Sequence, residues 1–196
     1  MLKFFDEGHI YEYNGAVIPS VSELLRFISR EVYGDINKYI LDRAAERGTA
    51  VHAATQALDE HGLVDCPEEI YGYLEAYVAF RRQHTVEWQY IEKPIAHPEM
   101  LYAGTIDRAG IVDGVPTVLD IKTNSAIKKP LVKAQLNGYK LLMDTIGFHA
   151  QRLCCLQLMS NGKYRLYQAA IDSTEFMSCY QIHCAMNKKH KRGTIE

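Results

Sequence analysis

The sequence lacks the features that mark several large classes of protein. No stretch of its 196 residues approaches the ~18 uninterrupted apolar residues that a membrane-spanning helix needs. It has no low-complexity run, and its 47% of hydrophobic residues is an ordinary fraction, so disorder is not expected. The N-terminus soon becomes acidic and alternating, which is typical neither of a signal peptide nor of a transit peptide. We therefore expect a folded protein without a membrane segment.

Cysteine is too scarce and too scattered to form a disulfide framework. The five cysteines are odd in number and include no C-x-x-C pair. Adjacent cysteines at 154 and 155 would point to opposite faces of a strand, so we expect them in the core. A reducing compartment, the cytoplasm, fits this usage.

The sequence also lacks the excess of positive charge that a protein needs to bind nucleic acid over its whole surface. Lys and Arg number 22 against 24 Asp and Glu, which gives a net charge of −2. Without residues 188–196 the balance is 18 basic against 23 acidic residues, or −5. A polyanion would therefore have to be held by local patches or by a bound metal. The basic tail at 188–192 would either contact phosphates or complement the dipole of a C-terminal helix.

Hydrophobic periodicity predicts a single α/β domain over residues 1–196. A β-hairpin about Asn14-Gly15 opens the chain, and capping-box spacing from Ser20 to Glu23 begins a helical region. Helices are expected at 20–30, 35–60 with a break near Gly48, 67–84, 130–146 and from 173 into the tail; strands are expected at 86–95, 102–112, 115–122, 152–159 and 164–171. This order predicts a central mixed sheet flanked by helices.

Two aspartates are placed opposite each other by a predicted two-residue turn. If Asp113-Gly114 forms a hairpin turn, the numbers of paired residues sum to 227, as those of Asp107 and Asp120 do. Residues paired in this way have Cβ atoms about 4.5–5.5 Å apart. Like charges at that distance repel each other unless a cation bridges them. A bulge at Gly110 would undo this register.

Lys122 lies two residues beyond Asp120 and therefore points to the same face of the strand. Ile121 points into the core, which leaves its carbonyl free to turn toward the two carboxylates. Carboxylate oxygens hold Mg²⁺ or Mn²⁺, and a lysine beside them can orient or deprotonate water or stabilise a transition state. The pattern favours metal-assisted hydrolysis of phosphate esters. The alternative is that the acids lie on the surface near the turn, with Lys122 as a salt-bridge partner.

Two helices could add further groups to this site. His52 lies in a helix with an unusually small face, which would pack closely on the sheet and bring the imidazole over the carboxylates as a nitrogen ligand favouring Mn²⁺. Gln135 and Tyr139 are four residues apart and share a helix face. The plainer interpretation is a half-buried histidine and an ordinary surface pair. The small residues are Ala44, Ala45, Gly48 and Ala53.

Taken together, these motifs resemble the PD-(D/E)XK nuclease superfamily, and within it the RecB-type exonuclease branch. The motifs occur in the family's order, as His52, Gly104-x-x-Asp107, Asp120-x-Lys122 and Gln135-x-x-x-Tyr139. The segment from His9 to Val21 is also similar to phage-encoded members and to the mitochondrial genome maintenance exonuclease. The resemblance covers about residues 9–143 and implies a restriction-endonuclease-like core with an N-terminal β-hairpin and helical region.

The resemblance implies roles for individual residues. The implied metal ligands are His52, Asp107, Asp120 and the carbonyl of Ile121. Lys122 would be the catalytic lysine, acting with the two aspartates, while Gln135 and Tyr139 would form a motif next to the DNA. Glu92 could approach a second metal or the lysine, but an exposed strand acid paired with Lys93 or Arg81 is the plainer account.

The chain departs from the family pattern in three ways. Ile106 stands where the family name has proline, and the middle acid is Asp120 rather than glutamate, which the family permits. Some RecB-type relatives carry a four-cysteine iron–sulfur cluster. The cysteines here lack the close terminal group, so we predict no Fe–S cluster.

The resemblance implies a divalent-metal-dependent exonuclease that acts on linear DNA ends, with single-stranded ends as one candidate substrate, in phage or bacterial replication, recombination or repair. The best candidates for phosphate contacts are Lys128, Lys129, Lys133 and Arg47. A recombination or single-strand-binding protein is a candidate partner, and the oligomeric state stays open. The alternatives are a non-catalytic DNA-binding module, a structure-specific endonuclease and a hydrolase of small phosphate esters. A degenerate module would be expected to have lost an aspartate or the lysine, and none is lost.

Overall fold

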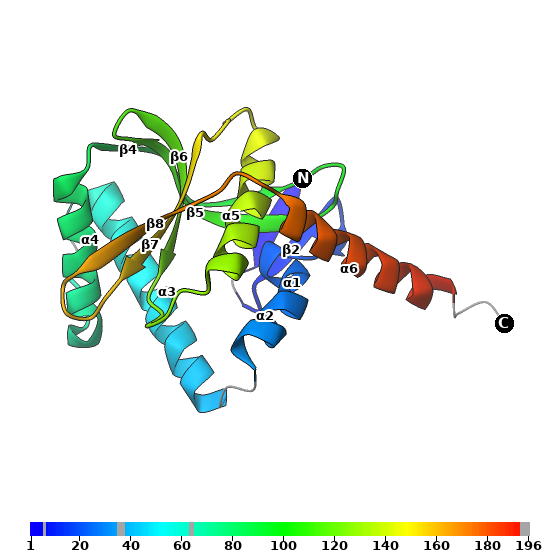
Figure 1. Ribbon diagram of the computed structural model, residues 1–196, viewed down its shortest axis with the longest axis horizontal. Coiled ribbons are helices and arrows are strands. Elements are labelled where there is room, and N and C mark those ends of the chain that lie inside the picture. Colours follow the sequence, from blue (N-terminus) through cyan, green and yellow to red (C-terminus); the bar gives the residue numbers. More distant parts are fainter. Residues whose placement is uncertain (6, 35–37, 63–64, 193–196) are drawn as a thin grey trace.

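The computed structural model describes residues 1–5, 7–34, 38–62 and 65–192 (Figure 1). A central five-stranded sheet has the order β4-β5-β6-β7-β8, and β6 and β7 are its parallel pair. Its strands are β4 (Val86–Ala96), β5 (Ala103–Val112), β6 (Val115–Lys122), β7 (Arg152–Leu158) and β8 (Tyr164–Ala169). The predicted mixed sheet flanked by helices is therefore confirmed.

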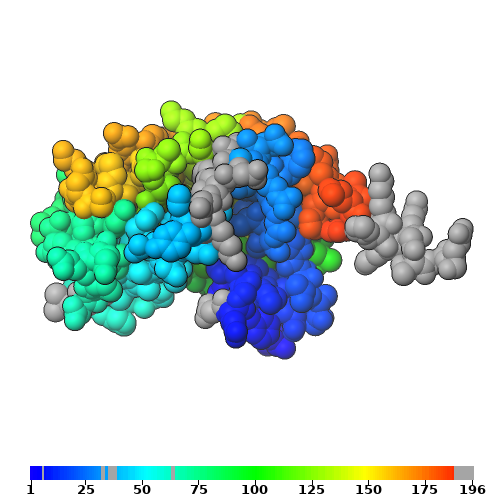
Figure 2. Space-filling view, turned by 90° about the horizontal axis from the view of Figure 1, so that it is seen from below, coloured from blue at the N-terminus to red at the C-terminus, as the bar shows by residue number. Residues whose placement is uncertain are grey.

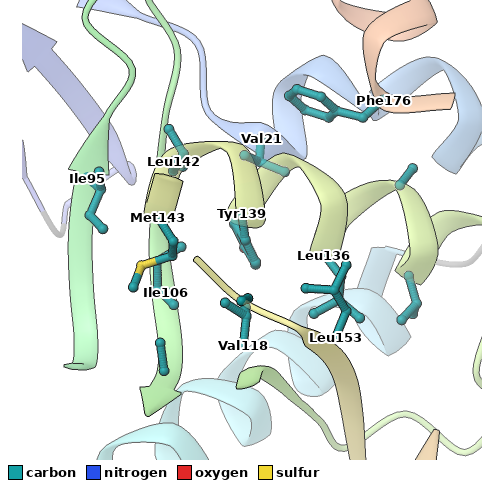
Figure 3. Close-up of a cluster of buried hydrophobic side chains, with 14 of the residues drawn as sticks. Val21, Ile95, Ile106, Val118, Leu136, Tyr139, Leu142, Met143, Leu153 and Phe176 are labelled. Carbon is teal, nitrogen blue, oxygen red and sulfur yellow. The ribbon is translucent and has the colours of Figure 1, made fainter. Parts of the chain in front are cut away.

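Helices cover both faces of this sheet. The helices are α1 (Val21–Leu24), α2 (Arg26–Tyr33), α3 (Lys38–His61), the 3₁₀ turn η1 (Glu68–Ile70), α4 (Tyr71–Gln83), α5 (Lys129–Asp144) and α6 (Thr174–Arg192). One hydrophobic core lies between the sheet and α1, α5 and α6, and a second lies between the opposite face and α3 and α4. Figure 3 shows the first core, in which Tyr139 and Leu142 of α5 face Ile106 of β5 and Val118 of β6.

A separate three-stranded antiparallel sheet stands at the N-terminus, formed by β1 (Leu2–Phe5), β2 (Ile10–Tyr13) and β3 (Ala16–Ile18). The predicted hairpin turn is present, since Asn14 and Gly15 both have positive φ and Tyr13 pairs with Ala16. β1 adds a third strand that the sequence did not predict. The predicted capping box is also present, with the hydroxyl of Ser20 accepting from the N–H of Glu23.

The hairpin of β5 and β6 has the predicted register. Asp113 and Gly114 both have positive φ, and every pair from Val112–Val115 to Arg108–Leu119 sums to 227. The irregularity opposite Gly110 lies in β4, between Trp88 and Tyr90, and does not disturb β6. The turn therefore determines which residues of β6 lie near Asp107.

Three expectations about the helices were wrong or lie outside the described residues. α3 continues through Gly48 without a break. The first predicted helix is two short helices that meet at Leu25. The predicted start at residue 35 lies outside the described residues, as do the basic side chains at 188–192. No described helix is long and apolar enough to cross a membrane.

Candidate active site

A cleft of about 910 Å³ lies between the N-terminal sheet and α3, and residues of β4, β5 and β6 form its floor. Figure 2 shows the N-terminal sheet, in dark blue, as a lobe beside α3, in cyan. The predicted site residues that line the cleft are His52, Asp107, Ile121, Lys122 and Tyr139, and Glu92 lines it as well. Side chains from residues 52 to 139 of the sequence therefore meet in one cavity.

Asp107 is buried at the floor of the cleft, with 7% of its surface exposed. Its Oδ2 accepts a hydrogen bond of 2.6 Å from the backbone N–H of Ile121. The paired residues of β5 and β6 end at Arg108 and Leu119, one pair before Asp107 and Asp120. The expectation that the two aspartates form a pair directly across the strands was therefore wrong. The carboxylate of Asp107 instead accepts from the backbone of Ile121, the residue that follows Asp120 on β6.

Asp120 and Lys122 form an ion pair on the face of β6 that carries both side chains. Lys122 Nζ donates to Asp120 Oδ1 over 3.0 Å and lies 2.9 Å from Oδ2. The Asp120 side chain is 1% exposed, and its Oδ2 accepts no well-aligned hydrogen bond in the part of the chain that the structure describes, although the Lys122 ammonium lies close to it. A buried carboxylate with one cationic neighbour still has lone pairs that can hold a second cation.

His52 reaches the floor from α3 and contacts three acceptor groups. Its Nδ1 lies 3.1 Å from Glu92 Oε1 and 3.8 Å from Asp107 Oδ1. Its Nε2 lies 3.2 Å from the carbonyl oxygen of Ile121. A carbonyl oxygen only accepts, so Nε2 carries a proton, and a proton on Nδ1 satisfies Glu92 as well. The arrangement fits a doubly protonated imidazolium.

The charges of the site shift several pKa values. Burial lowers the pKa of His52, but Asp107 and Glu92 outweigh this and raise it to about 9. Burial and the repulsion of Asp120 and Glu92 raise the pKa of Asp107 to about 7, although His52 opposes the shift. Burial lowers the pKa of Lys122, but the charges of Asp120 and Asp107 raise it above its ordinary value. The lysine is therefore a cation in this arrangement.

Glu92 belongs to the site, contrary to the expectation of an exposed acid paired with Lys93 or Arg81. Its side chain is 20% exposed, and its Oε1 accepts from Arg108 Nη1 over 2.9 Å as well as contacting His52. Burial raises the pKa of Glu92, but the bonds and charges of His52 and Arg108 give a net lowering. Its φ of 43° is unusual for a non-glycine residue, and such strain is concentrated at functional sites.

Arg108, which the sequence interpretation missed, anchors the site from behind. Its side chain is fully buried; Nε donates to Asp59 Oδ2 over 2.7 Å and Nη2 to Thr55 Oγ1 over 3.1 Å. Asp59 also accepts from Tyr77 and Arg81 of α4. The network ties α3 and α4 to β5. A charged residue in the apolar run after Asp107 is the sequence signal that could have indicated a buried ion pair.

The Gln135–Tyr139 motif supports the floor. Gln135 Nε2 donates to Tyr139 Oη over 2.9 Å. Tyr139 is 7% exposed, and its ring packs so closely on Gly104 that an added Cβ would lie 2.9 Å from Cε1. The glycine three residues before Asp107 is thus required by the tyrosine of α5. Of this pair, Tyr139 lines the cleft and Gln135 does not.

The small face of α3 lines the cleft, contrary to the expectation of close packing on the sheet. Its members in the cleft wall include Ala44, Ala45, Gly48 and Ala53. A Cβ added at Gly48 would meet nothing within 4 Å outside its own helix. The small side chains therefore keep the cavity open.

Two of the lysines predicted to contact phosphates line another cavity. Lys129 and Lys133 border a cavity of about 360 Å³ beside β8. Lys133 Nζ lies 2.6 Å from Asp172 Oδ2 and 2.8 Å from Glu175 Oε1. The ammonium group of Lys129 lies over the ring of Tyr167. The structure does not bring these two lysines to the cleft.

The other two predicted phosphate contacts do not line the cleft either. The guanidinium of Arg47 lies over the ring of Tyr73 on α4, 5.8 Å from its centroid. Lys128 is the residue that precedes the first turn of α5.

The donor groups on the floor fit a divalent cation. His52, Glu92 and Asp107 each offer a ligand atom, and these atoms lie within 4.8 Å of one another. Asp120, paired with Lys122 and outside this group of three, is a further carboxylate close enough to Asp107 to raise its pKa. Carboxylate oxygens with one imidazole nitrogen are typical ligands of hard and intermediate divalent metals. The lysine beside them can hold an anionic group that such a cation attracts.

No family model matches this sequence, and no curated protein matches it. Among solved structures, the chain is similar to the alkaline exonuclease LHK-Exo from Laribacter hongkongensis, at 13% identity and a TM-score of 0.47, over 90% of this chain and 94% of that one. It is also similar to LHK-Exo in complex with dAMP, at 12% identity and a TM-score of 0.46, over 88% and 89% of the two chains.

Proposed function

We propose that this protein is a divalent-metal-dependent DNA exonuclease of the PD-(D/E)XK superfamily, RecB-type branch, and that residues 1–196 form its nuclease domain. The observation that supports this most is that His52, Asp107, Ile121 and Lys122 line one cleft, while Asp120 is buried beside them in its pair with Lys122. The chemistry of these donors suits Mg²⁺ or Mn²⁺ and a phosphodiester.

The metal ligands in this proposal are His52, Asp107, Asp120 and the carbonyl of Ile121, and the geometry adds Glu92 to them. A cation held there supplies positive charge for the phosphoryl oxygens and for an attacking water. Lys122 is held as a cation by Asp120, so it donates to a phosphoryl oxygen and stabilises the negative charge of the transition state. Deprotonation of water by Lys122 is disfavoured by its raised pKa.

The remaining residues position the strand and the floor. Tyr139 supports Gly104 beneath the strand, and Gln135 acts through its hydrogen bond to Tyr139. Phosphate contacts by Lys128, Lys129, Lys133 and Arg47 stay a prediction, and they would have to lie along the DNA outside the cleft. We place the activity in the cytoplasm of a bacterial or phage-infected cell, in DNA replication, recombination or repair, with a recombination or single-strand-binding protein as its partner.

The test is digestion of end-labelled linear DNA, single- and double-stranded, beside a closed circle of the same sequence. Each substrate is incubated with Mg²⁺, Mn²⁺ or EDTA and with the native protein, Asp120→Ala or Asp42→Ala. Asp42 is an exposed acid of α3 outside the cleft and serves as the matched control. We expect metal-dependent loss of linear DNA with the native protein and Asp42→Ala, and none with Asp120→Ala.

Other outcomes would replace the proposal with a specific alternative. Cutting of the closed circle would indicate an endonuclease. Salt-dependent DNA binding without any cutting would favour a non-catalytic module, because phosphate contacts make binding depend on salt. Equal activity of the native protein and Asp120→Ala would show that the activity does not come from this site.

A further inference from the structure

Gln157 of β7 is a buried amide beside the strand that carries Lys122, and the chemistry of the floor does not use it. The two residues are paired across the parallel strands β6 and β7, and Gln157 is 1% exposed. Its Nε2 donates to the carbonyl oxygens of Asn124 and Ser125, over 2.7 Å and 3.1 Å. Both acceptors belong to the segment that follows Lys122, so the side chain joins β7 to that segment.

The partners of this amide determine its orientation. A carbonyl oxygen only accepts, so the group that faces the two carbonyls is the NH₂ group. The Oε1 atom then accepts from Tyr167 Oη of β8 over 3.3 Å. A buried amide needs partners for its polar atoms, and here the nitrogen and the oxygen of Gln157 both have them. The amide is therefore held in one orientation between β8 and the segment after Lys122.

The segment of residues 124–126 depends on this amide for its position. It belongs to no helix or strand, and all three of its residues are exposed. Lys122 is paired with β7 at one end of the segment, and Ile127 packs on the core at the other end. In the part of the chain that the structure describes, the two bonds from Gln157 are the only hydrogen bonds to the backbone of residues 124–126.

The start of this segment forms part of the edge of the cleft. Thr123 and Asn124 line the cavity that contains Asp107 and Lys122. Thr123 is buried, with 8% of its surface exposed, whereas Asn124 is exposed to solvent. Asparagine side chains are among the donors that contact the phosphates of DNA. The exposed amide of Asn124, two residues beyond Lys122, is therefore suited to a phosphate oxygen, and Gln157 holds the backbone that carries it.

We infer that Gln157 is a positioning residue of the active site, which holds the backbone at Asn124 and Ser125 so that the amide of Asn124 contacts the substrate strand beside the phosphate that Lys122 meets. This inference rests on the proposed function and adds a substrate contact to that site. Lys122 itself is held by the pairing of β6 with β7 and by Asp120, without this amide. Loss of the amide should therefore weaken DNA binding and raise KM, and kcat should stay close to its native value.

The test compares the loss of two buried amides. Gln157→Met keeps the length of the side chain and removes the amide. Asn137→Leu is the matched control, because Asn137 is also 1% exposed and donates to two carbonyl oxygens, those of Lys133 and Ala170, but lies outside the cleft. Asn124→Ala removes the exposed amide itself, and because it changes a surface residue it tests the contact even if Gln157→Met does not fold.

The first measurement is the rate at which trypsin cleaves the folded protein after Lys128, with the fragments identified by mass spectrometry. Gln157→Met should be cleaved there about tenfold faster than the native protein, because a segment that has lost two hydrogen bonds opens more often. Asn137→Leu should stay near the native rate at this bond. Equal rates in Gln157→Met and Asn137→Leu would overturn the inference, whether or not the protein is a nuclease.

The second measurement is kcat and KM on end-labelled linear DNA. Gln157→Met and Asn124→Ala should each raise KM about tenfold, the effect of losing one hydrogen bond to a charged group, with kcat within about twofold of native. The double variant should raise KM no further, because both changes remove the same contact, and Asn137→Leu should keep the native KM. A native KM in Asn124→Ala, or effects that multiply in the double variant, would overturn the inference while leaving the nuclease in place. Absence of cleavage by the native protein would overturn the proposed function instead, and the dissociation constant for labelled DNA in Ca²⁺, measured by fluorescence anisotropy, would then replace KM in the same comparison.

Discussion

Binding of a divalent cation to the floor of the cleft should release protons. His52 contacts acceptors at both ring nitrogens, 3.1 Å from Glu92 and 3.2 Å from the Ile121 carbonyl, and its pKa is raised to about 9. The pKa of Asp107 is raised to about 7. Both groups must lose their protons to act as ligands, so protons compete with the metal and affinity rises with pH.

The expected size follows from these two pKa values. At pH 7.5 about 97% of His52 and about a quarter of Asp107 are protonated, so about 1.2 protons leave when the metal binds. Between pH 6.5 and pH 8.5 the apparent affinity should rise about 300-fold. The steps belong to the pair of groups rather than to either residue alone.

The assay is isothermal titration calorimetry of the metal-free protein with Mn²⁺ in two buffers of different ionisation enthalpy. The difference in observed heat gives the number of protons released. His84→Gln is the matched control, because His84 forms a surface pair with Asp113 over 2.6 Å and does not line the cleft. It should release the same number of protons as the native protein. Release of fewer than about 0.3 protons, or an affinity flat over this pH range, would refute the reasoning.

Three further predictions concern single substitutions. Lys122→Ala should lower cleavage about 100-fold or more, measured with end-labelled DNA, while fluorescence anisotropy still detects DNA binding; unchanged cleavage would remove the lysine from the mechanism. Arg108→Met should lower the free energy of unfolding by about 3–5 kcal/mol in urea, because it leaves the buried carboxylate of Asp59 with one ionic partner fewer; a loss below about 1 kcal/mol would contradict this. Gly110→Ala should destabilise by about 3 kcal/mol, since a Cβ would collide with the carbonyl oxygen of Glu87, and a native urea midpoint would show that β4 gives way instead.

The strand pairing and the neighbourhood of the two aspartates could be predicted because they depend on local chemistry. Asp113-Gly114 favours positive φ at two successive residues, which selects a two-residue turn and with it the whole register of β5 and β6. The paired residues of β5 and β6 end one pair before the aspartates. There the carboxylate of Asp107 accepts a hydrogen bond from the N–H of Ile121. The register of the turn predicts the pairing of whole residues, and it does not predict that this side chain accepts from the backbone.

The functions of α3 and of the basic residues could not be predicted in this way. Small residues on a helix face allow either close packing or an open cavity, and the tertiary structure shows that here they line the cleft. Lys133 lies one helical turn from Lys129, but its carboxylate partners Asp172 and Glu175 come from just before and just inside the start of α6, so the pairing depends on where α6 packs.

The sequence by itself determined the order of the helices and strands from β2 onward, apart from the division of the first helix, and the two-residue turns, because periodicity and turn geometry act over a few neighbouring residues. It also singled out the residues to which we assign the chemistry. Only the tertiary structure decided that Glu92 lies against His52, that Arg108 is buried on Asp59, and that Tyr11 bonds to Thr105 and lines the same cleft as Asp107. These contacts join segments 40 or more residues apart, and they form only when whole faces of helices and sheets are buried against one another.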